Sequence, residues 1–221
     1  MSKIAPKSER QQQALDKGTA FHSAVELWAK TGDLGGVLAG LLDDEVRGWV
    51  ELLAMTWAPP LGAHFELALG LSPGGGYCPV VEPEPHVYVA APGVGQGNGR
   101  LLTAGRADVV ADVFGVAVVR DWKTGRYPVS PPAENLQLTA LAIAAASALG
   151  CPSFVREIYY VRDGALDSDP HPVLLDSDEG MAAWEMVEAA AQLDDSPRPG
   201  EWCTPCWERR LRRCDRAQVA A

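Results

Sequence analysis

The N-terminal part of the chain alternates between polar stretches and apolar residues at helical spacing. Residues 1–17 are polar and predict a loose arm. Apolar positions recur with the period of a helix over 18–30, with Thr19 as the predicted N-cap, and again over 34–57. Both helices would bury one face, and the second would contribute Leu41, Val46, Trp49, Val50 and Leu53 to a core.

The pattern then changes to the period of strands. Residues 64–71 alternate enough for a strand, whereas 72–99 are rich in glycine and proline and indicate a long insertion or flap. Two runs rich in valine and alanine flank Phe114-Gly115, which predicts a β-hairpin that turns at these two residues. The remaining apolar runs predict a buried helix over 130–149, a strand over 154–161 and a last helix over 178–193.

Helices and strands in this order predict an α/β fold with a mixed central sheet. The hairpin would lie in that sheet, flanked by the helices that carry His22 and Gln137. We expect one core domain over 18–200 and a separate cysteine- and arginine-rich segment over 201–221.

Composition narrows the class of protein. The chain is 47% hydrophobic, and its apolar runs are too short to span a bilayer, so we expect no membrane partner. The N-terminus lacks the apolar centre of a signal peptide, and five cysteines in such a chain favour reduced thiols or metal ligation in the cytoplasm. The net charge of −10 argues against non-specific coating of nucleic acid but leaves room for an enzyme with a local basic track.

The hairpin carries the strongest candidate chemistry. A turn at Phe114-Gly115 places Asp108 directly across from Asp121, with the two Cβ atoms roughly 5 Å apart. Facing carboxylates repel each other, and a divalent cation between them would compensate. Lys123 lies two residues beyond Asp121 and therefore on the same face. The alternatives are an ordinary solvated hairpin end, or a bulge at the turn that breaks the facing pair.

Polar residues on the predicted helices and on the first strand form a second group of candidates. His22 and Glu26 lie four residues apart and share one helix face, which by itself is typical of a polar surface. Glu66 would add a carboxylate to the hairpin if its strand is adjacent, although an exposed glutamate is the plainer interpretation. Gln137 is the polar exception on an apolar helix, where it would bond to a strand backbone.

Positive charge gathers in the C-terminal segment. A helix there would either contact phosphates or form a solvated surface, and the sequence leaves both open. The arginines concerned are Arg209, Arg210, Arg212, Arg213 and Arg216.

Taken in order, these residues resemble the RecB-like branch of the PD-(D/E)XK nucleases, which includes CRISPR-adaptation exonucleases and the nuclease domains of bacterial recombination helicases. Ala107 stands where the family name has proline, and Leu141 stands where the family's Gln-x-x-x-Tyr helix has tyrosine. The matching pieces are GTAFHSAVE at 18–26, GRAD at 105–108, VVRDWKTG at 118–125, Gln137 on the following helix, and the cysteines near the end.

The resemblance implies a restriction-endonuclease-like core and a site for Mg²⁺ or Mn²⁺. His22, Asp108 and Asp121 would ligate the ion together with the backbone carbonyl of Trp122, and such oxygen-rich ligation suits these ions. Lys123 would orient the attacking water or stabilise the developing charge.

Three further residues take supporting roles in this resemblance. Gln137 would position DNA. Glu26 and Glu66 would support the metal ligands or bind a second ion.

The resemblance also implies a metal bound by cysteines. Cys203, Cys206 and Cys214 resemble three ligands of the family's iron–sulfur cluster, for which Cys78 or Cys151 would have to supply the fourth. A continuous helix between Cys206 and Cys214 would hold them roughly 12 Å apart, so the segment must loop if they share a metal. A 4Fe–4S cluster, a structural Zn²⁺ and no metal all remain open.

We therefore expect a divalent-metal-dependent deoxyribonuclease, an exonuclease that acts on DNA ends or single strands in recombination, repair or CRISPR adaptation. The same resemblance admits protein partners in such complexes and a homo-oligomer. Two alternatives remain: a nuclease-fold DNA-binding or assembly subunit that does not cut, and a zinc-stapled interaction module.

Overall fold

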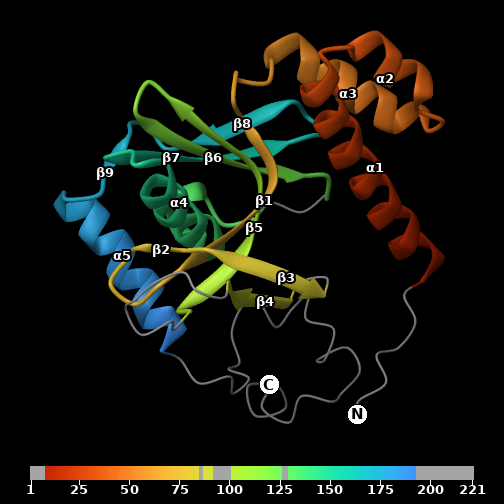
Figure 1. The fold of residues 1–221 in the computed structure, drawn as a ribbon. Helices are drawn as coiled ribbons and strands as arrows, with labels where there is room; N and C mark the ends of the chain where they lie inside the picture. Colours follow the sequence, from red (N-terminus) through yellow and green to blue (C-terminus); the bar gives the residue numbers. More distant parts are fainter. Residues whose placement is uncertain (1–7, 85–86, 92–100, 126–128, 193–221) are drawn as a thin grey trace, which may run out of the picture.

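Seven strands form a mixed sheet, and a separate two-stranded sheet lies beside it (Figure 1). The computed structural model describes residues 8–84, 87–91, 101–125 and 129–192. Neighbouring strands follow the order β2-β1-β5-β6-β7-β8, and β9 also pairs with β7. β6 and β7 run parallel, whereas the other described pairs are antiparallel. The strands of the main sheet are β1 (His64–Leu71), β2 (Tyr77–Cys78), β5 (Thr103–Val113), β6 (Val116–Lys123), β7 (Ser153–Tyr160), β8 (Ala165–Ser168) and β9 (Val173–Leu174).

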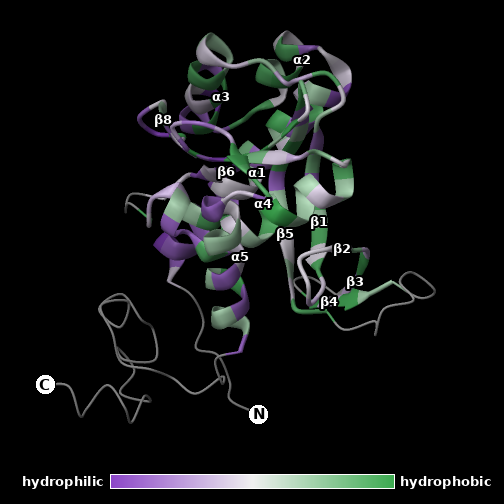
Figure 2. Cartoon of the chain, turned by 90° about the vertical axis from the view of Figure 1, so that its left-hand side faces the viewer, coloured by the Kyte–Doolittle hydropathy of each residue, from purple (hydrophilic) through white to green (hydrophobic). Residues whose placement is uncertain are grey.

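Helices cover both faces of this sheet, and each face has its own apolar core. α1, α2 and α3 pack on one face, where Trp122 and Tyr159 point. α4 and α5 pack on the other face, and α5 carries both purple and green residues, as expected for a helix with one side in water (Figure 2). This arrangement confirms the predicted α/β fold. The helices are α1 (Glu9–Thr31), α2 (Leu34–Gly40), α3 (Asp44–Thr56), α4 (Leu136–Leu149) and α5 (Asp178–Ala191), and no helix among the described residues has the length and apolar character to cross a bilayer.

Helix α1 begins earlier than the sequence predicts. The loose arm predicted over 1–17 is wrong for residues 8–17, because Ser8 and Gln11 form a capping box that starts the helix at Glu9. Thr19 is therefore an interior residue. The neighbouring glycine does not mark a boundary: a Cβ added to Gly18 would lie 3.1 Å from Oγ1 of Thr124, so a small residue is needed where the helix passes the end of β6.

Three other predicted boundaries also change. The single helix over 34–57 is two helices, since Asp43 caps a new start at Asp44. Within 72–99, the structure contains β2 and a small sheet of β3 (Val80–Glu84) and β4 (Val87–Ala90). α4 starts at Leu136, capped by Asn135, after a short 3₁₀ turn.

The β5–β6 hairpin has the predicted turn and register. Phe114 and Gly115 have φ values of +53° and +83°, and positive values at both central residues are what a type I′ turn requires. Paired residues run from Val113 and Val116 at the tip to Val109 and Arg120. The register therefore continues without a bulge toward Asp108.

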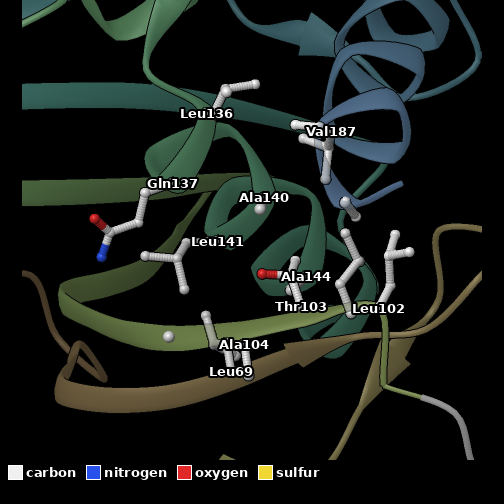
Figure 3. Close-up of a pocket in the computed structure, with 14 residues that line it drawn as sticks. Leu69, Leu102, Thr103, Ala104, Leu136, Gln137, Ala140, Leu141, Ala144 and Val187 are labelled. Carbon is white, nitrogen blue, oxygen red and sulfur yellow. The ribbon is translucent and has the colours of Figure 1, made fainter. Parts of the chain in front are cut away.

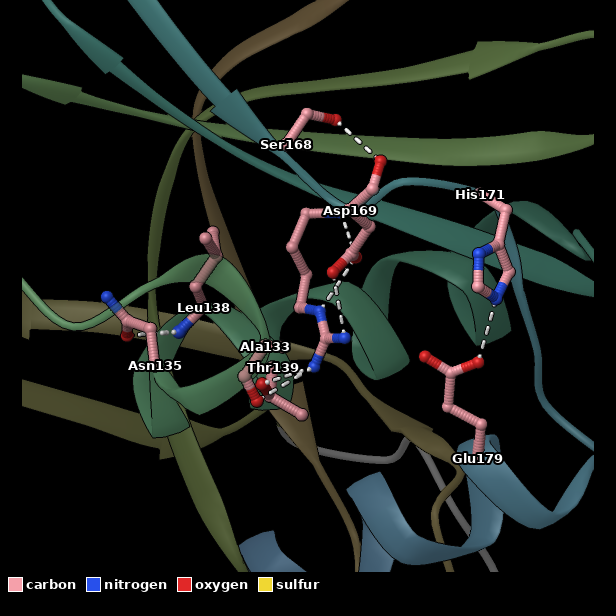
Figure 4. A network of polar contacts seen from close by, with 9 residues as sticks. Ala133, Asn135, Leu138, Thr139, Ser168, Asp169, His171 and Glu179 are labelled. Carbon is pink, nitrogen blue, oxygen red and sulfur yellow. Dashed lines mark hydrogen bonds and ion pairs between the residues drawn. The ribbon is translucent and has the colours of Figure 1, made fainter.

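A buried ion pair holds the start of α4 against the sheet (Figure 4). Arg156 on β7 donates from Nε to Asp169 at 2.8 Å, and both side chains are almost fully buried. The same guanidinium donates to the hydroxyl of Thr139 on α4 at 3.0 Å. The pair thus fixes the helix that carries Gln137.

Candidate active site

The candidate site lies where β5 and β6 separate. Their last paired residues are Val109 and Arg120, so Asp108 and Asp121 occupy the next position on the two strands. The side chain of Asp108 fills the gap, because its Oδ2 accepts a hydrogen bond from the backbone N–H of Trp122 at 2.6 Å. The turn and the register are those that a facing pair of aspartates requires.

Strand β1 adds Glu66 on the other side of Asp108. The β1–β5 pairs before and after it leave Glu66 opposite Asp108. Its φ of +50° is unusual for a residue other than glycine. Phe65 packs in the core under α1–α3 and Leu67 in the core under α4, although residues two apart on a regular strand share a face. The strained backbone at Glu66 marks this change of side, and such strain is typical of functional sites.

Helix α1 supplies His22. Its neighbour Phe21 is fully buried and meets the Trp122 ring edge-on, with centroids 5.9 Å apart. This packing places Nδ1 of His22 2.8 Å from Oε1 of Glu66 and 3.4 Å from Oδ1 of Asp108. One ligand atom from each of these three side chains lies within 4.8 Å of the others, a spacing that can hold a metal ion.

Two members of this cluster, Asp108 and His22, have raised pKa values. Burial, reinforced by the charges of Asp121 and Glu66, raises the pKa of Asp108 to about 7 despite the opposing effect of His22. Burial opposes protonation of His22, but the hydrogen bond to Glu66 and the charge of Asp108 outweigh it and raise the pKa of the imidazole. The same hydrogen bond lowers the pKa of Glu66. A bound cation would displace these protons.

Strand β6 brings a carboxylate and an ammonium group to the same side. Nζ of Lys123 lies 2.5 Å from Oδ2 of Asp121. The contact is an ion pair without hydrogen-bond geometry, and no described residue donates a hydrogen bond to this buried oxygen. Trp122 lies between Asp121 and Lys123 in the sequence and points to the opposite face of the sheet, where it is 4% exposed. Its burial fixes the positions of the two side chains that flank it.

These donors fit a hard divalent cation. Carboxylates and one imidazole are suitable ligands for Mg²⁺ or Mn²⁺. The raised pKa of Asp108 indicates that negative charge is in excess around its carboxylate.

Comparison with known proteins agrees with this geometry. The family profile described as the PD-(D/E)XK nuclease superfamily matches residues 2–214. The chain belongs to this superfamily. No curated protein and no solved structure matched it. PD-(D/E)XK nucleases use divalent metals, which is the chemistry that the donor set favours.

A groove along α1 leads to the PD-(D/E)XK site. Glu26 lies in its wall and pairs with Lys30 at 2.7 Å, so it faces the groove but does not belong to the described metal-binding set. The groove is lined by Ala14, Leu15, Gly18, Thr19, His22, Ser23 and Glu26 of α1 and by Glu66, Arg106 and Thr124.

Arg106 connects the site to the small sheet. Its guanidinium forms an ion pair with Glu82 on β3, and its Nη1 lies 3.8 Å from Oε2 of Glu66. Tyr88 on β4 is close enough to be affected by the same carboxylate: burial, and then the charge of Glu66, raise the pKa of its phenol. The glycine- and proline-rich insertion thus reaches the site.

Gln137 is exposed. The prediction that this side chain is buried and bonds to a strand backbone is therefore wrong. It lies in the first turn of α4, before the buried residues begin at Leu138. A Cβ added to Gly105 would lie 3.8 Å from its Nε2. Figure 3 shows Gln137 at the edge of an apolar pocket, with its amide directed away from Leu102 and Val187. Leu141, which stands where the resemblance places a tyrosine, also lines this pocket.

The cysteine prediction can be followed only in part. Cys78 and Cys151 are buried and form no disulfide, and burial together with Asp112 raises the pKa of the Cys151 thiol. The other predicted residues of the C-terminal segment lie outside the described residues, namely Cys203, Cys206, Cys214, Arg209, Arg210, Arg212 and Arg213.

Sequence reasoning ranked Glu66 too low and did not select Arg106 or Tyr88. A charged residue between Phe65 and Leu67, in the middle of an apolar strand, was the available signal for Glu66. Arg106 and Tyr88 approach the site only through the pairing of β1 with β5 and the fold of the insertion, which have no local sequence signature.

Proposed function

We propose that this PD-(D/E)XK protein is a divalent-metal-dependent deoxyribonuclease of the RecB-like branch that acts as an exonuclease on DNA ends or single strands. The observation that carries the proposal is the meeting of His22, Glu66 and Asp108 beside the Asp121–Lys123 pair. Four acidic or imidazole groups and one ammonium group at a single fork in the sheet supply what hydrolysis of a phosphodiester needs.

Each side chain takes a distinct role in this proposal. His22, Glu66 and Asp108 would hold the metal ion, and Asp121, which the sequence predicts as a ligand and which lies outside this group of three, would complete the coordination. The bound ion would activate a water molecule and neutralise charge on the phosphate. Lys123 orients the attacking water or stabilises the charge that develops on phosphate oxygens, since a preorganised cation is most effective where charge appears.

The test is cleavage of single- and double-stranded DNA labelled at either end, with Mn²⁺, with Mg²⁺ and with EDTA. Asp121→Asn is compared with Asp163→Asn, a matched change of an exposed aspartate on a loop. We expect metal-dependent loss of label in the wild type and in Asp163→Asn, and none in Asp121→Asn. The product ladder gives the polarity.

Intact DNA under every condition, from protein that is folded and binds Mn²⁺, would contradict the nuclease proposal. That outcome would favour a nuclease-fold subunit that handles DNA without cutting it. Cleavage of a circular single strand, which has no end, would instead contradict only the proposal that the enzyme is an exonuclease.

A further inference from the structure

The β3–β4 hairpin has one face toward solvent and one toward the candidate site. Val81 and Val89 are paired across the two strands and are exposed by 42% and 44%. Their neighbours Glu82 and Tyr88 therefore lie on the opposite face, because successive side chains of a strand alternate. On that face, Glu82 forms the ion pair with Arg106.

The inward face meets the groove along α1 at Arg106. Arg106 lies in the groove wall together with Glu66 and bridges Glu66 to Glu82. Tyr88 is partly buried, and its phenol is within the electrostatic influence of Glu66. Tyr88 therefore lies on the same face of the hairpin as the Glu82–Arg106 ion pair, and Arg106 in turn approaches a carboxylate of the metal-binding set.

We propose that Tyr88 and Arg106 form a binding subsite for one nucleotide of single-stranded DNA, with the ring of Tyr88 stacked on an unpaired base and Arg106 bound to a phosphate. This inference rests on the proposed nuclease function and specifies its substrate as a single-stranded end. The insertion that carries β3 and β4 is then the element that selects the substrate.

The chemistry of the two side chains supports this assignment. Stacking of a base on an aromatic ring requires the base to be out of a duplex, and it tolerates any sequence because every base has a π-face. A guanidinium group has five N–H donors and favours bidentate contacts with phosphate.

The test is the affinity for a fluorescein-labelled oligo(dT) strand and for a labelled duplex, measured by anisotropy in EDTA so that metal-dependent cleavage does not occur. We expect Tyr88→Ala to weaken binding of the single strand by about tenfold and Tyr88→Phe to change it less than about twofold, since the ring carries the contact. Duplex affinity should not change. Tyr77→Ala is the matched control, because Tyr77 is a partly exposed tyrosine on β2 outside the groove.

Equal affinity of Tyr88→Ala and the wild type for the single strand would overturn the inference, as would an equal loss in Tyr88→Phe. An equal loss for the duplex would overturn the single-strand assignment. The nuclease proposal is judged separately by cleavage with Mn²⁺. A wild type that binds oligo(dT) through Tyr88 but cuts nothing would refute that proposal and leave the subsite standing.

Discussion

The backbone N–H of Trp122 donates to the Asp108 carboxylate at 2.6 Å, at the point where the β5–β6 ladder has ended. Asp108 therefore has two roles that substitutions can separate. One oxygen satisfies a strand amide, and the other approaches His22 in the metal-binding set. An asparagine retains an acceptor for the amide, whereas an alanine removes it.

Asp108→Asn should stabilise the metal-free protein at alkaline pH. The folded-state pKa of about 7 exceeds the usual value of 3.8, so the folded protein binds more protons than the unfolded chain between these values. The free energy of unfolding therefore falls as the pH rises through this window, and the raised pKa of His22 acts in the same direction. Urea denaturation in EDTA should show that the stability advantage of Asp108→Asn over the wild type is larger at pH 8 than at pH 5 by roughly 1–3 kcal/mol. A wild type as stable at pH 8 as at pH 5 would contradict this prediction.

Mn²⁺ should raise the melting temperature of the wild type more at pH 8 than at pH 6. Protons on Asp108 and His22 compete with the ion, and metal binding releases them. Glu66→Gln should lose most of this stabilisation. Glu179→Gln, which alters an exposed glutamate paired with His171, should retain it. Equal Mn²⁺ effects in both variants would remove Glu66 from the proposed ligands.

Lys123→Ala should lose cleavage while it keeps the response to Mn²⁺. The ammonium group pairs with Asp121 and is not among the metal-binding donors, so its loss removes charge stabilisation rather than the ion. Removal of one preorganised group of this kind typically lowers the rate by about 10²–10³-fold. Single-turnover cleavage and thermal melting with Mn²⁺ measure the two properties, and Lys30→Ala, an exposed lysine, serves as control. A variant that cuts at the wild-type rate would refute the role of Lys123.

Arg156→Met should destabilise the whole fold. It would leave Asp169 charged and buried without its partner, which typically costs about 3–5 kcal/mol. The double variant Arg156→Met/Asp169→Leu should recover much of this loss because no unpaired charge remains. Urea unfolding measures both, with Arg10→Met as the exposed control. No recovery in the double variant would show that the bonds to Thr139 and Ala133, rather than the charge, dominate.

The hairpin could be predicted from sequence because its information is local. A Phe-Gly tip between β-branched runs specifies a two-residue turn, and the turn specifies which residues of the two strands face each other. The positions of Asp108, Asp121 and Lys123 follow from this register. The end of α4 at Gly150 is equally local, since glycine there adopts a left-handed conformation with φ of +69°.

The rest of the site depends on long-range packing. The metal-binding distances of His22 are set by Phe21 packing on Trp122, about one hundred residues away in the chain. The position of Glu66 in the site depends on its positive φ, which residue propensities for helix and strand do not predict. The exposure of Gln137 depends on where Asn135 caps α4, and the strong helix formers around it obscured that start.

Helix α1 is attached to the protein along only part of its length. Residues 9–16 are all exposed, whereas the buried side chains begin at Phe21 and continue with Ala24, Val25 and Trp28. We expect the backbone amides of the first two turns to exchange hydrogen for deuterium quickly and those after Phe21 to be protected. The entrance of the groove at Ala14 and Leu15 would then be compliant while the wall beside His22 stays rigid. A strand end could spread the entrance as it enters without disturbing the geometry on which its hydrolysis depends.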